Sequence, residues 1–474
     1  MLEIVAYIAV FLVSLTLLLV IHESGHFFVA KKAGVRVQEF GIGFPPRLWG
    51  FRYGETVYSL NLIPFGAFVR MLGEEDSTEP RSLAAKSAGT RLLIMAAGPF
   101  MNAVLAVFLF TLLFMFPRSV LVGDVVIQGV LHDSPAQEAG ILRGDTVIEV
   151  NGQALDSHRD LLLLIDLNLG TKMIWHVQRE SRIIPVELEP SFDLPGAQGA
   201  DIIAGNVLIK DVEPGSPAQL AGIFPGDVVL KVGGEDIEEQ AQLISLVNRE
   251  AGQLTSWTLK RGEENVSTQL ASRVNPPVGE GPVGIVISTV NQRVVSRPER
   301  LWSEIAEGYA SSDHAGVALS TLNVSTESRS FAPWTAFGMG IGQMGDILVV
   351  MKNTFSMWNS GGAPPEVAGP VGIGHMFVEI GQVPDVSLAA RGLVFLQLTA
   401  AISMVLALFN FLPIPALDGG RMMFVLIELL RRGKRISPQK EGFVHMVGFV
   451  VLITFLLLVT FADISKLGDN LLGV

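Results

Sequence analysis

The sequence alternates between long apolar stretches and mixed segments, and this pattern predicts where the chain crosses a membrane. The apolar stretches cover residues 4–30, 92–116, 393–430 with interruptions, and 443–461. A helix rises about 1.5 Å per residue and the hydrocarbon core of a bilayer is about 30 Å thick, so each stretch can span it. We therefore expect an α-helical core of four transmembrane spans.

Residues 36–72, which follow the first stretch, have a different pattern. Segments 35–44 and 56–63 are rich in β-branched and aromatic side chains, and prolines punctuate both. This composition favours β-hairpins that lie against the membrane-embedded core. Because an unpaired strand edge cannot face lipid, these hairpins must pair with protein or with an incoming extended peptide.

Lysine and arginine residues are concentrated in two segments. Residues 31–91, after the first span, contain nine of them, and residues 431–440, between the last two spans, contain five. With four spans, both segments lie on the same side of the membrane, and the positive-inside rule makes that side cytoplasmic. Both termini and residues 117–392 are then expected outside.

Composition narrows the function classes. The mean hydropathy of +0.45 fits a membrane protein with a soluble part, and the absence of cysteine excludes thiol catalysis and thiolate metal ligands. Between residues 120 and 300 the chain has 25 acidic and 14 basic residues, which accounts for nearly all of its net charge of −12. An acidic outer region argues against nucleic-acid binding.

The outer region contains an internal repeat. Residues 134–145 read SPAQEAGILRGD, and residues 216–227, at an offset of 82, read SPAQLAGIFPGD. Each copy leads into a short apolar strand and a glycine-containing turn, so we expect a duplicated module and not a solenoid. The pattern S-P-A-x-x-A-G-Φ-x-x-G-D resembles the PDZ domain, in which a short helix leads into a strand.

The PDZ resemblance implies a peptide-binding groove in each copy, because PDZ domains hold an extended peptide by strand addition. In the second copy the groove is expected at Val283, Gly284 and Ile285, and in the first copy at residues 200–204, a poorer match. The alternative is that one or both modules are steric covers that bind no peptide.

The residues suited to catalysis lie in the first apolar stretch, where His22 to His26 form an HExxH motif. Residues four apart share one face of a helix, so the two imidazoles can ligate a single zinc ion. Glu23 points to the side, where it can take a proton from an attacking water molecule. Three ionisable groups in a membrane-grade helix are costly, so they indicate a function.

A catalytic zinc site takes three protein ligands and leaves one position open. Asp418 lies in the segment NFLPIPALDGG, whose prolines break the third span. Irregular backbone at membrane depth is tolerated only around a protein-lined cavity, which favours Asp418 as the third ligand. Glu428 is expected at the cytoplasmic interface. The other candidates, expected to be ordinary interior residues, are His375 and His445.

Two segments before the third span have weaker patterns. Residues 341–351 carry apolar side chains along one flank, which is typical of an interfacial helix or of a packed helix in the outer region. Residues 311–330 are rich in serine and threonine and are expected to form an extra polar loop with a solvated His314.

The HExxH motif in the first span, N-x-x-P-x-P-x-L-D-G in the third, and tandem PDZ modules before the third resemble the site-2 protease family over almost the whole chain. The resemblance implies that His22, His26 and Asp418 bind zinc (Zn2+) and that Glu23 activates the water. It also implies that Asn410 is a substrate-side residue.

We therefore expect a multi-domain membrane protein with an α-helical transmembrane core, membrane-associated β-hairpins and two extracytoplasmic PDZ domains of α+β structure. The expected parts are residues 1–116 with two spans and the hairpins, 120–205 and 206–292 with the PDZ domains, 293–392 with a linker and candidate interfacial helices, and 393–474 with the last two spans.

The function implied by the resemblance is that of an intramembrane zinc metalloprotease, which cleaves within transmembrane segments of single-pass proteins such as anti-sigma factors. It implies the inner membrane of a bacterium and a role in the envelope stress response, with the PDZ domains and both termini periplasmic and the active site near the cytoplasmic side. Two alternatives stay open: a general peptidase that clears signal-peptide remnants, and a PDZ scaffold with a structural zinc. Glu23 argues against the scaffold, because a structural site needs no base beside its ligands.

Overall fold

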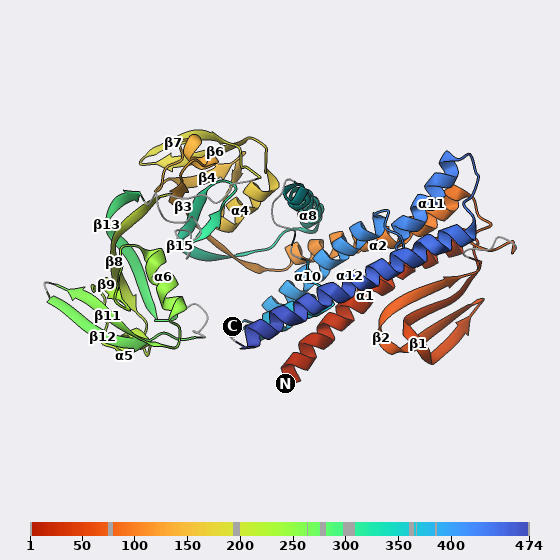
Figure 1. Ribbon diagram of the computed structural model, residues 1–474, viewed down its shortest axis with the longest axis horizontal. Coiled ribbons are helices and arrows are strands. Elements are labelled where there is room, and N and C mark those ends of the chain that lie inside the picture. Colours follow the sequence, from red (N-terminus) through yellow and green to blue (C-terminus); the bar gives the residue numbers. More distant parts are fainter. Residues whose placement is uncertain are drawn as a thin grey trace. The chain divides into compact units, whose positions relative to one another are not determined.

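The computed structural model describes residues 2–73, 79–192, 200–262, 264–274, 281–296, 309–359, 365, 367–383 and 386–472. The chain forms two compact units, and Figure 1 shows the long helices in one and most of the strands in the other. The first unit comprises Met1–Arg118, Ser330–Ile347 and Glu366–Val474, and the second comprises Ser119–Arg329 and Leu348–Pro365.

Four helices of the first unit are long and apolar enough to cross a membrane, as the hydrophobic pattern predicts. They are α1 (Leu2–Lys32), α2 (Ala88–Met115), α10 (Leu388–Phe411) and α12 (Pro438–Leu472). α2 packs against both α1 and α10, and the shorter α9 (Pro370–Gln382) lies against α1 and α12. The helix that carries the HExxH motif is therefore packed against protein on more than one side.

Residues 341–351 are helical and belong to α8 (Pro333–Asn359). Met344 and Ile347 pack against a buried cluster that contains Phe110 of α2 and Ala400 of α10. Residues 341–347 are therefore a packed helix of the first unit, whereas residues 348–351 begin the part of α8 that belongs to the second unit.

The third apolar stretch is broken where its prolines predict. α10 ends at Phe411, and α11 (Asp418–Leu430) begins at Asp418. Pro413 and Pro415 cannot donate the backbone hydrogen bonds that would continue a helix. A Cβ atom at Gly419 would collide with the backbone of this loop. The loop therefore folds tightly over the first turn of α11 and fixes Asp418 at the start of that helix.

The residues after the first span form a sheet of two bent strands, β1 (Val37–Tyr53) and β2 (Thr56–Met71), as their strand-like composition predicts. The first part of β1 lies in the middle, because Phe40 pairs with Tyr58 on one side and with Val69 on the other. The end of β1 and the end of β2 are therefore the two outer edges of the sheet, and the end of β2 is called the edge segment 66–71 below.

One buried carboxylate joins the parts of this sheet. Glu39, in the middle strand, accepts hydrogen bonds from Ser59 at 2.8 Å and from Arg47 at 2.6 Å. Arg70, in the edge segment, lies 3.6 Å from the same carboxylate. Hydrogen bonds to a charged group are stronger than neutral ones, so Glu39 ties both outer edges to the centre of the sheet.

The repeat in the second unit folds into two modules whose described elements follow the same order, except for one additional strand, β14, in the first. The first module contains β3 (Arg118–Leu131), α3 (Pro135–Glu138), β4 (Thr146–Val150), β5 (Gln153–Ala154), α4 (His158–Leu167), β6 (Met173–Arg179), β7 (Arg182–Leu188), β14 (Ala310–Ser312) and β15 (Val317–Arg329). The second contains β8 (Ala200–Val212), α5 (Pro217–Leu220), β9 (Val228–Val232), β10 (Glu235–Asp236), α6 (Gln240–Arg249), β11 (Leu254–Arg261), β12 (Glu264–Ala271) and β13 (Ile285–Ser296).

The aspartate of each repeat copy has a structural role. Asp145 accepts two hydrogen bonds from Arg179, at 2.7 and 2.8 Å, and Asp227 accepts two from Arg261, both at 2.7 Å. Both carboxylates are almost fully buried. The Gly-Asp step of the motif therefore anchors a turn to a neighbouring strand in the same way in both modules.

The last strand of the first module comes after the whole second module. Val317 and Leu319 are buried in the same core as Trp175. Most of residues 311–330, which we expected to belong to the linker at 293–392 and to form an extra loop, thus belong to strands β14 and β15. The expectation was wrong because only the first three residues of β15 are fully buried, and its later side chains are largely exposed and polar.

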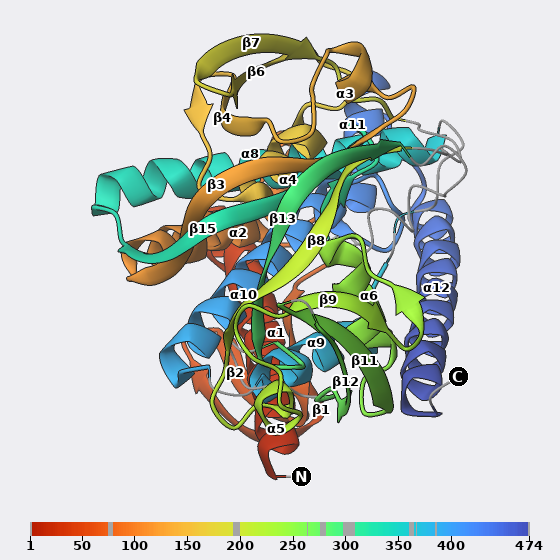
Figure 2. The ribbon, with the colours of Figure 1, turned by 90° about the vertical axis from the view of Figure 1, so that its left-hand side faces the viewer.

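Two further expectations about the first module were wrong: the solvated position of His314 and the position of the peptide groove. His314 is not simply solvated, because its Nδ1 lies 2.9 Å from the carbonyl oxygen of Ser191. Residues 200–204, expected to line that groove, are the start of β8 and pair with β3 and β13 of the sheet, as Figure 2 shows for β8 and β13.

Gly316 is the counterpart of Gly284. The N–H of Glu213 donates to the carbonyl of Gly284, and the N–H of Leu131, 82 residues earlier, donates to the carbonyl of Gly316, both at 2.9 Å. Both glycines have φ of +74°, and a Cβ atom at either would collide with the serine that begins its SPA segment. The equivalent strands are therefore β15 and β13.

These two strands differ at their second edge. β15 pairs with β3 and also with β14, which brings Ser312 opposite Val317 and Ala310 opposite Leu319. β13 pairs with β8 alone among the strands of the described residues, and α6 lies beside it. The first module thus places its own β14 where the second module has an unpaired strand edge.

Candidate metal centre

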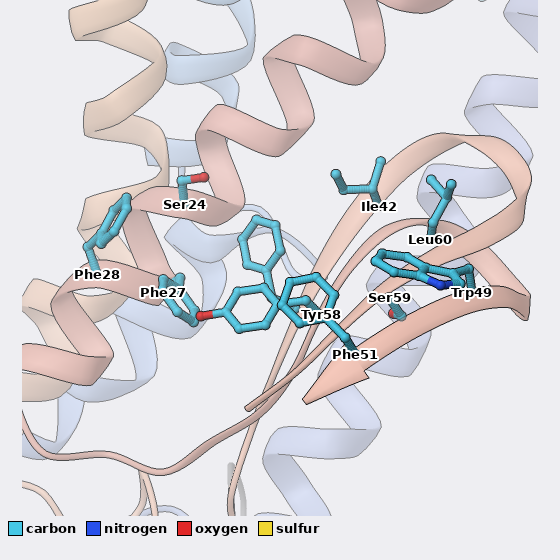
Figure 3. A pocket seen from close by; sticks show the side chains of 10 residues that line it. Ser24, Phe27, Phe28, Ile42, Trp49, Phe51, Tyr58, Ser59 and Leu60 are labelled. Carbon is cyan, nitrogen blue, oxygen red and sulfur yellow. The ribbon is translucent and has the colours of Figure 1, made fainter. Parts of the chain in front are cut away.

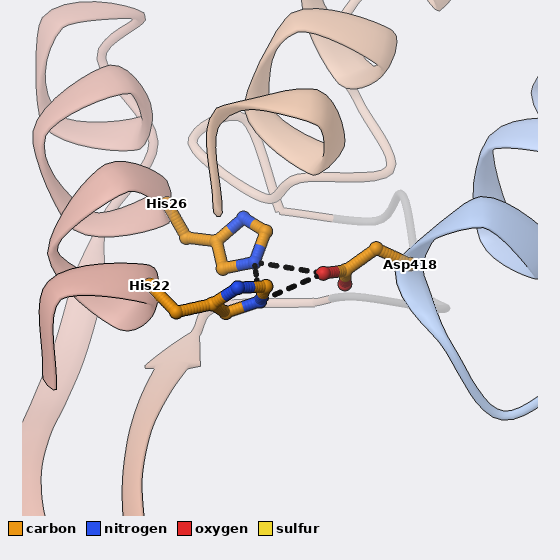
Figure 4. A group of neighbouring side chains, drawn as sticks. All are labelled: His22, His26 and Asp418. Atoms are coloured by element: carbon orange, nitrogen blue, oxygen red, sulfur yellow. Dashed lines mark hydrogen bonds and ion pairs between the residues drawn. The ribbon is translucent and has the colours of Figure 1, made fainter. Parts of the chain in front are cut away.

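Three side chains from α1 and α11 meet inside the first unit. His22 and His26 lie one turn apart on α1, and Asp418 is the first residue of α11 (Figure 4). The two histidines are almost fully buried, and the Asp418 side chain is 19% exposed. The motif in the first span and the break in the third, 396 residues apart, therefore contribute to one site.

The spacing of the three side chains fits a metal ion. His22 Nε2 lies 2.9 Å from Asp418 Oδ2, and His26 Nε2 lies 3.2 Å from both that oxygen and His22 Nε2. Ligands at 2.0–2.2 Å from a tetrahedral zinc ion are about 3.3 Å apart, close to these separations. Within the described residues, this is the one group of three or more potential ligands that converge. Two nitrogens and one oxygen form a donor set suited to a catalytic zinc site.

Small residues make room for the two imidazoles. A Cβ atom at Gly98 of α2 would collide with His26 Nε2 and would lie 2.7 Å from His22 Nε2. A Cβ atom at Gly25 would likewise collide with the carbonyl of Ala97. The two glycines therefore let α1 and α2 approach closely at the level of the site.

Groups on α2 orient the imidazoles. His26 Nδ1 lies 2.7 Å from the carbonyl oxygen of Ile94, an arrangement that requires the proton on Nδ1 and frees Nε2 for a metal. The amide of Asn102 lies 3.4 Å from His22 Nδ1, and its buried oxygen has no donor among the described residues. A half-turn of the amide exchanges its oxygen and nitrogen, and the oxygen can then accept from His22 Nδ1–H.

Asn102 was missed in the sequence, although a signal exists. It is one of few polar side chains in the second apolar stretch, and a buried polar group in a membrane-grade helix needs a partner. Ser403 of α10 donates to its backbone carbonyl at 2.8 Å. The polar residue in an apolar helix could therefore have been noticed in the sequence. Its partners on α1 and α10 could not, because they lie far away along the chain.

Glu23 lies between the metal ligands and the β-sheet. It sits on α1 next to His22, and its carboxylate faces the backbone N–H of Val69 in the edge segment 66–71. It is not one of the three converging ligands. The arrangement places a carboxylate beside the three converging side chains and next to an outer strand of the sheet.

The chain matches the family model described as peptidase family M50 over residues 10–455. The chain belongs to peptidase family M50. Together with the names of similar proteins given below, this membership shows that the chain is a metalloprotease.

The names of similar curated proteins agree with a metalloprotease. The regulator of sigma-E protease RseP of Escherichia coli is 28% identical over 468 residues, covering 93% of this chain and 94% of the relative. A protein of Neisseria meningitidis described as a zinc metalloprotease is 28% identical and covers 89% and 90%. One from Clostridium perfringens with the same description is 39% identical over 191 residues, and the match spans 40% of this chain and 56% of that relative.

A solved structure resembles part of this M50 chain. The PDZ domain of an SdrC-like protein from Listeria monocytogenes has 18% sequence identity and a TM-score of 0.16. The match covers 17% of this chain and 85% of that domain.

The other candidate ligands do not join His22, His26 and Asp418 within the described residues. His375 is paired with Glu379 at 3.3 Å on α9, and its side chain is 37% exposed. His445 on α12 accepts a hydrogen bond from the backbone N–H of Ala416. Neither belongs to the converging group within the described residues.

Glu428 was expected at the cytoplasmic interface and not among the ligands, and within the described residues it lies outside the converging group. Its carboxylate is buried and lies 2.5 Å from Arg91 of α2, with Arg435 at 3.3 Å. A buried charge needs a partner of opposite sign, and Arg91, far away in the sequence, supplies it. The pair joins α11, which begins with Asp418, to α2.

The expected substrate-side residues are placed as follows. Asn410, in the last turn of α10, donates its amide to the carbonyl of Leu406 at 2.9 Å and has no hydrogen bond to the metal ligands within the described residues. Val283 is buried in the core of the second module, and Gly284 and Ile285 lead into β13.

An apolar cavity of about 490 Å³ lies beside the HExxH helix, between α1 and the β1–β2 sheet (Figure 3). Ser24, adjacent to Glu23, contributes to its wall. The other lining residues are mostly large and apolar: Phe27, Phe28, Phe40, Ile42, Trp49, Phe51, Tyr58, Ser59 and Leu60. The sheet and the helix together thus form a surface suited to apolar side chains next to the site.

Proposed function

We propose that this M50 metalloprotease cleaves peptide bonds within or beside the transmembrane segments of single-pass membrane proteins. The observation that carries the proposal is the convergence of His22, His26 and Asp418, on helices that include a candidate membrane span, with Glu23 beside them. A soluble protease needs no such burial in apolar helices, whereas a protease that cuts in the membrane does.

In this proposal His22, His26 and Asp418 hold a zinc ion, which would supply Lewis-acid polarisation of the scissile carbonyl and of water. Glu23 accepts the proton of the attacking water and then gives it to the leaving amine. Asn102 and the carbonyl of Ile94 keep the imidazoles turned toward the site.

A transmembrane helix must unwind locally before it can be cut, because its carbonyls are tied up in internal hydrogen bonds. The edge segment 66–71 offers a strand edge at which an extended substrate can pair. Its Val69 already contacts Glu23, so a substrate paired there lies next to the base. The aromatic cavity can take apolar side chains of the same substrate.

The names of the relatives support a substrate class. RseP of Escherichia coli is named as a regulator of a sigma factor, so we propose anti-sigma factors in a bacterial inner membrane, cleaved in the envelope stress response, as substrates. Signal-peptide remnants are the alternative class. The basic segments around 31–91 and 431–440 support a cytoplasmic position for the end of α1 that bears the site.

Metal removal tests the proposal. The purified protein, reconstituted in vesicles with a single-pass model substrate, is expected to lose cleavage after chelation and to regain it when zinc is returned. A substitution of exposed Glu379 by Gln serves as the matched control and should respond as the wild type does. Cleavage that survives complete zinc removal would overturn the proposal.

The two modules are proposed to be PDZ domains that restrict access to the site. The repeated SPA and Gly-Asp segments, and Gly284 and Gly316 at equivalent points, support this assignment. An extended peptide can add to the unpaired edge of β13, the strand that begins at Ile285 and lies beside α6. In the first module β14 takes the corresponding edge of β15, so the second module is the proposed peptide site.

Removing residues 119–329 is expected to make the protease less selective. Substrates with long outer domains, which the full chain refuses, should then be cut, because a size filter discriminates by exclusion. The measurement is cleavage of a substrate series with increasing outer domains by the full and shortened chains. An identical size limit for both would contradict the filter, and loss of all cleavage with zinc retained would indicate recruitment through β13 instead.

A further inference from the structure

Helix α12 contacts the loop that carries the third metal ligand. The backbone N–H of Ala416, two residues before Asp418, donates to Nδ1 of His445 at 3.0 Å. The loop between α10 and α11 thus has a hydrogen bond to a third helix just before the ligand. Nothing in the sequence pattern around His445 predicts this contact.

Ala416 is in a backbone conformation that needs support. Its φ is +80°, in the left-handed region that residues other than glycine rarely adopt. Pro413 and Pro415 have no N–H, and the N–H groups of Ile414 and Leu417 bond to carbonyls within the loop. Within the described hydrogen bonds of residues 413–417, Ala416 is therefore the residue whose backbone N–H bonds to another element.

The same face of α12 packs on the loop and on α11. A Cβ atom at Gly448, one turn after His445, would collide with Pro415. The ring of His445 lies 5.3 Å from the ring of Phe424, on α11. Close packing at these points places His445 where it can fix the position of the loop relative to α11.

We propose that His445 is a positioning residue for the metal site. Its Nδ1 holds the left-handed turn at Ala416, and this turn aims the Asp418 carboxylate at the two α1 imidazoles. The acceptor role requires the neutral ring with its proton on Nε2. The inference rests on the proposed zinc chemistry and adds a residue on α12 that touches no ligand directly.

Two substitutions separate the hydrogen bond from the packing. His445→Phe keeps a ring against Phe424 but removes the acceptor, whereas His445→Asn supplies a carbonyl oxygen near the position of Nδ1. We expect His445→Phe to lose zinc to a chelator about tenfold faster than the wild type, as for the loss of other outer-shell partners of a metal site. His445→Asn should release zinc at close to the wild-type rate.

A second substitution tests whether the left-handed turn at Ala416 is the reason for the faster zinc loss. Ala416→Gly makes the left-handed conformation easy, so the double variant His445→Phe/Ala416→Gly should retain zinc better than His445→Phe alone. The visible spectrum of the cobalt-substituted protein reports the ligand geometry. It should match the wild type in His445→Asn and differ in His445→Phe. Thermal unfolding in detergent identifies any variant that has lost its fold.

The outcomes distinguish this inference from the proposed function. If the wild type binds one zinc and His445→Phe has the same release rate and cobalt spectrum, the positioning role is wrong while the zinc site stands. Equal zinc loss in the Phe and Asn variants would assign the effect to ring packing and would also overturn the inference. A wild type that binds no zinc at all would instead overturn the proposed function.

Discussion

Glu23→Gln is expected to abolish cleavage while about one zinc ion per chain stays bound. The side chain lies beside the ligands but is not one of them, and its carboxylate contacts the edge segment 66–71. Loss of a general base lowers the rate by roughly 100-fold or more, because the amide cannot accept the proton of water. Zinc content by mass spectrometry and cleavage of a model substrate are measured on the same preparation.

The control for Glu23→Gln is the exposed Glu379→Gln, which should keep both properties. If zinc content falls together with activity in Glu23→Gln, the residue is a ligand or holds the site together, and its assignment as a base is wrong.

Asp418→Asn is expected to lose both zinc and activity. A neutral amide is a poor ligand compared with a carboxylate, and Asp418 Oδ2 is the atom within 3.2 Å of both imidazoles. Loss of a direct ligand should weaken zinc binding by more than the roughly 10- to 100-fold that loss of an outer-shell partner costs. Zinc affinity is measured by competition with a chelator of known strength.

His375→Ala is the matched control for Asp418→Asn, because His375 lies in the same unit, pairs with Glu379 and is not part of the converging group of the described residues. Full zinc occupancy in Asp418→Asn, together with complete loss in His445→Ala, would reverse the choice between the two candidates. The positioning role proposed for His445 predicts faster zinc release in that variant but not complete loss.

The sequence predicts those parts of the fold and site that depend on local patterns. Apolar length identifies the four helices, and the spacing of His22 and His26 places them on one helical face. Pro413 and Pro415 end α10 before Asp418, as the loss of backbone donors requires. In each case the physical cause lies within a few residues of its effect.

The features that the sequence does not predict depend on contacts between distant segments. Arg91 neutralises Glu428 across 337 positions, and Asn102 reaches His22 across 80. β15 completes the first module only after the second module has intervened, so its polar tail reads as a loop. Such pairings follow from helix packing and strand order. Neither can be deduced from the residues that surround each partner in the sequence.

The most direct test of the account is the position of the cut bond. A single-pass substrate is incubated with the reconstituted protein, and the ends of both products are determined by mass spectrometry. The account predicts a cut within or directly beside the apolar span, and no cut with Glu23→Gln. Cleavage only in the soluble outer domain of the substrate, far from its span, would contradict it.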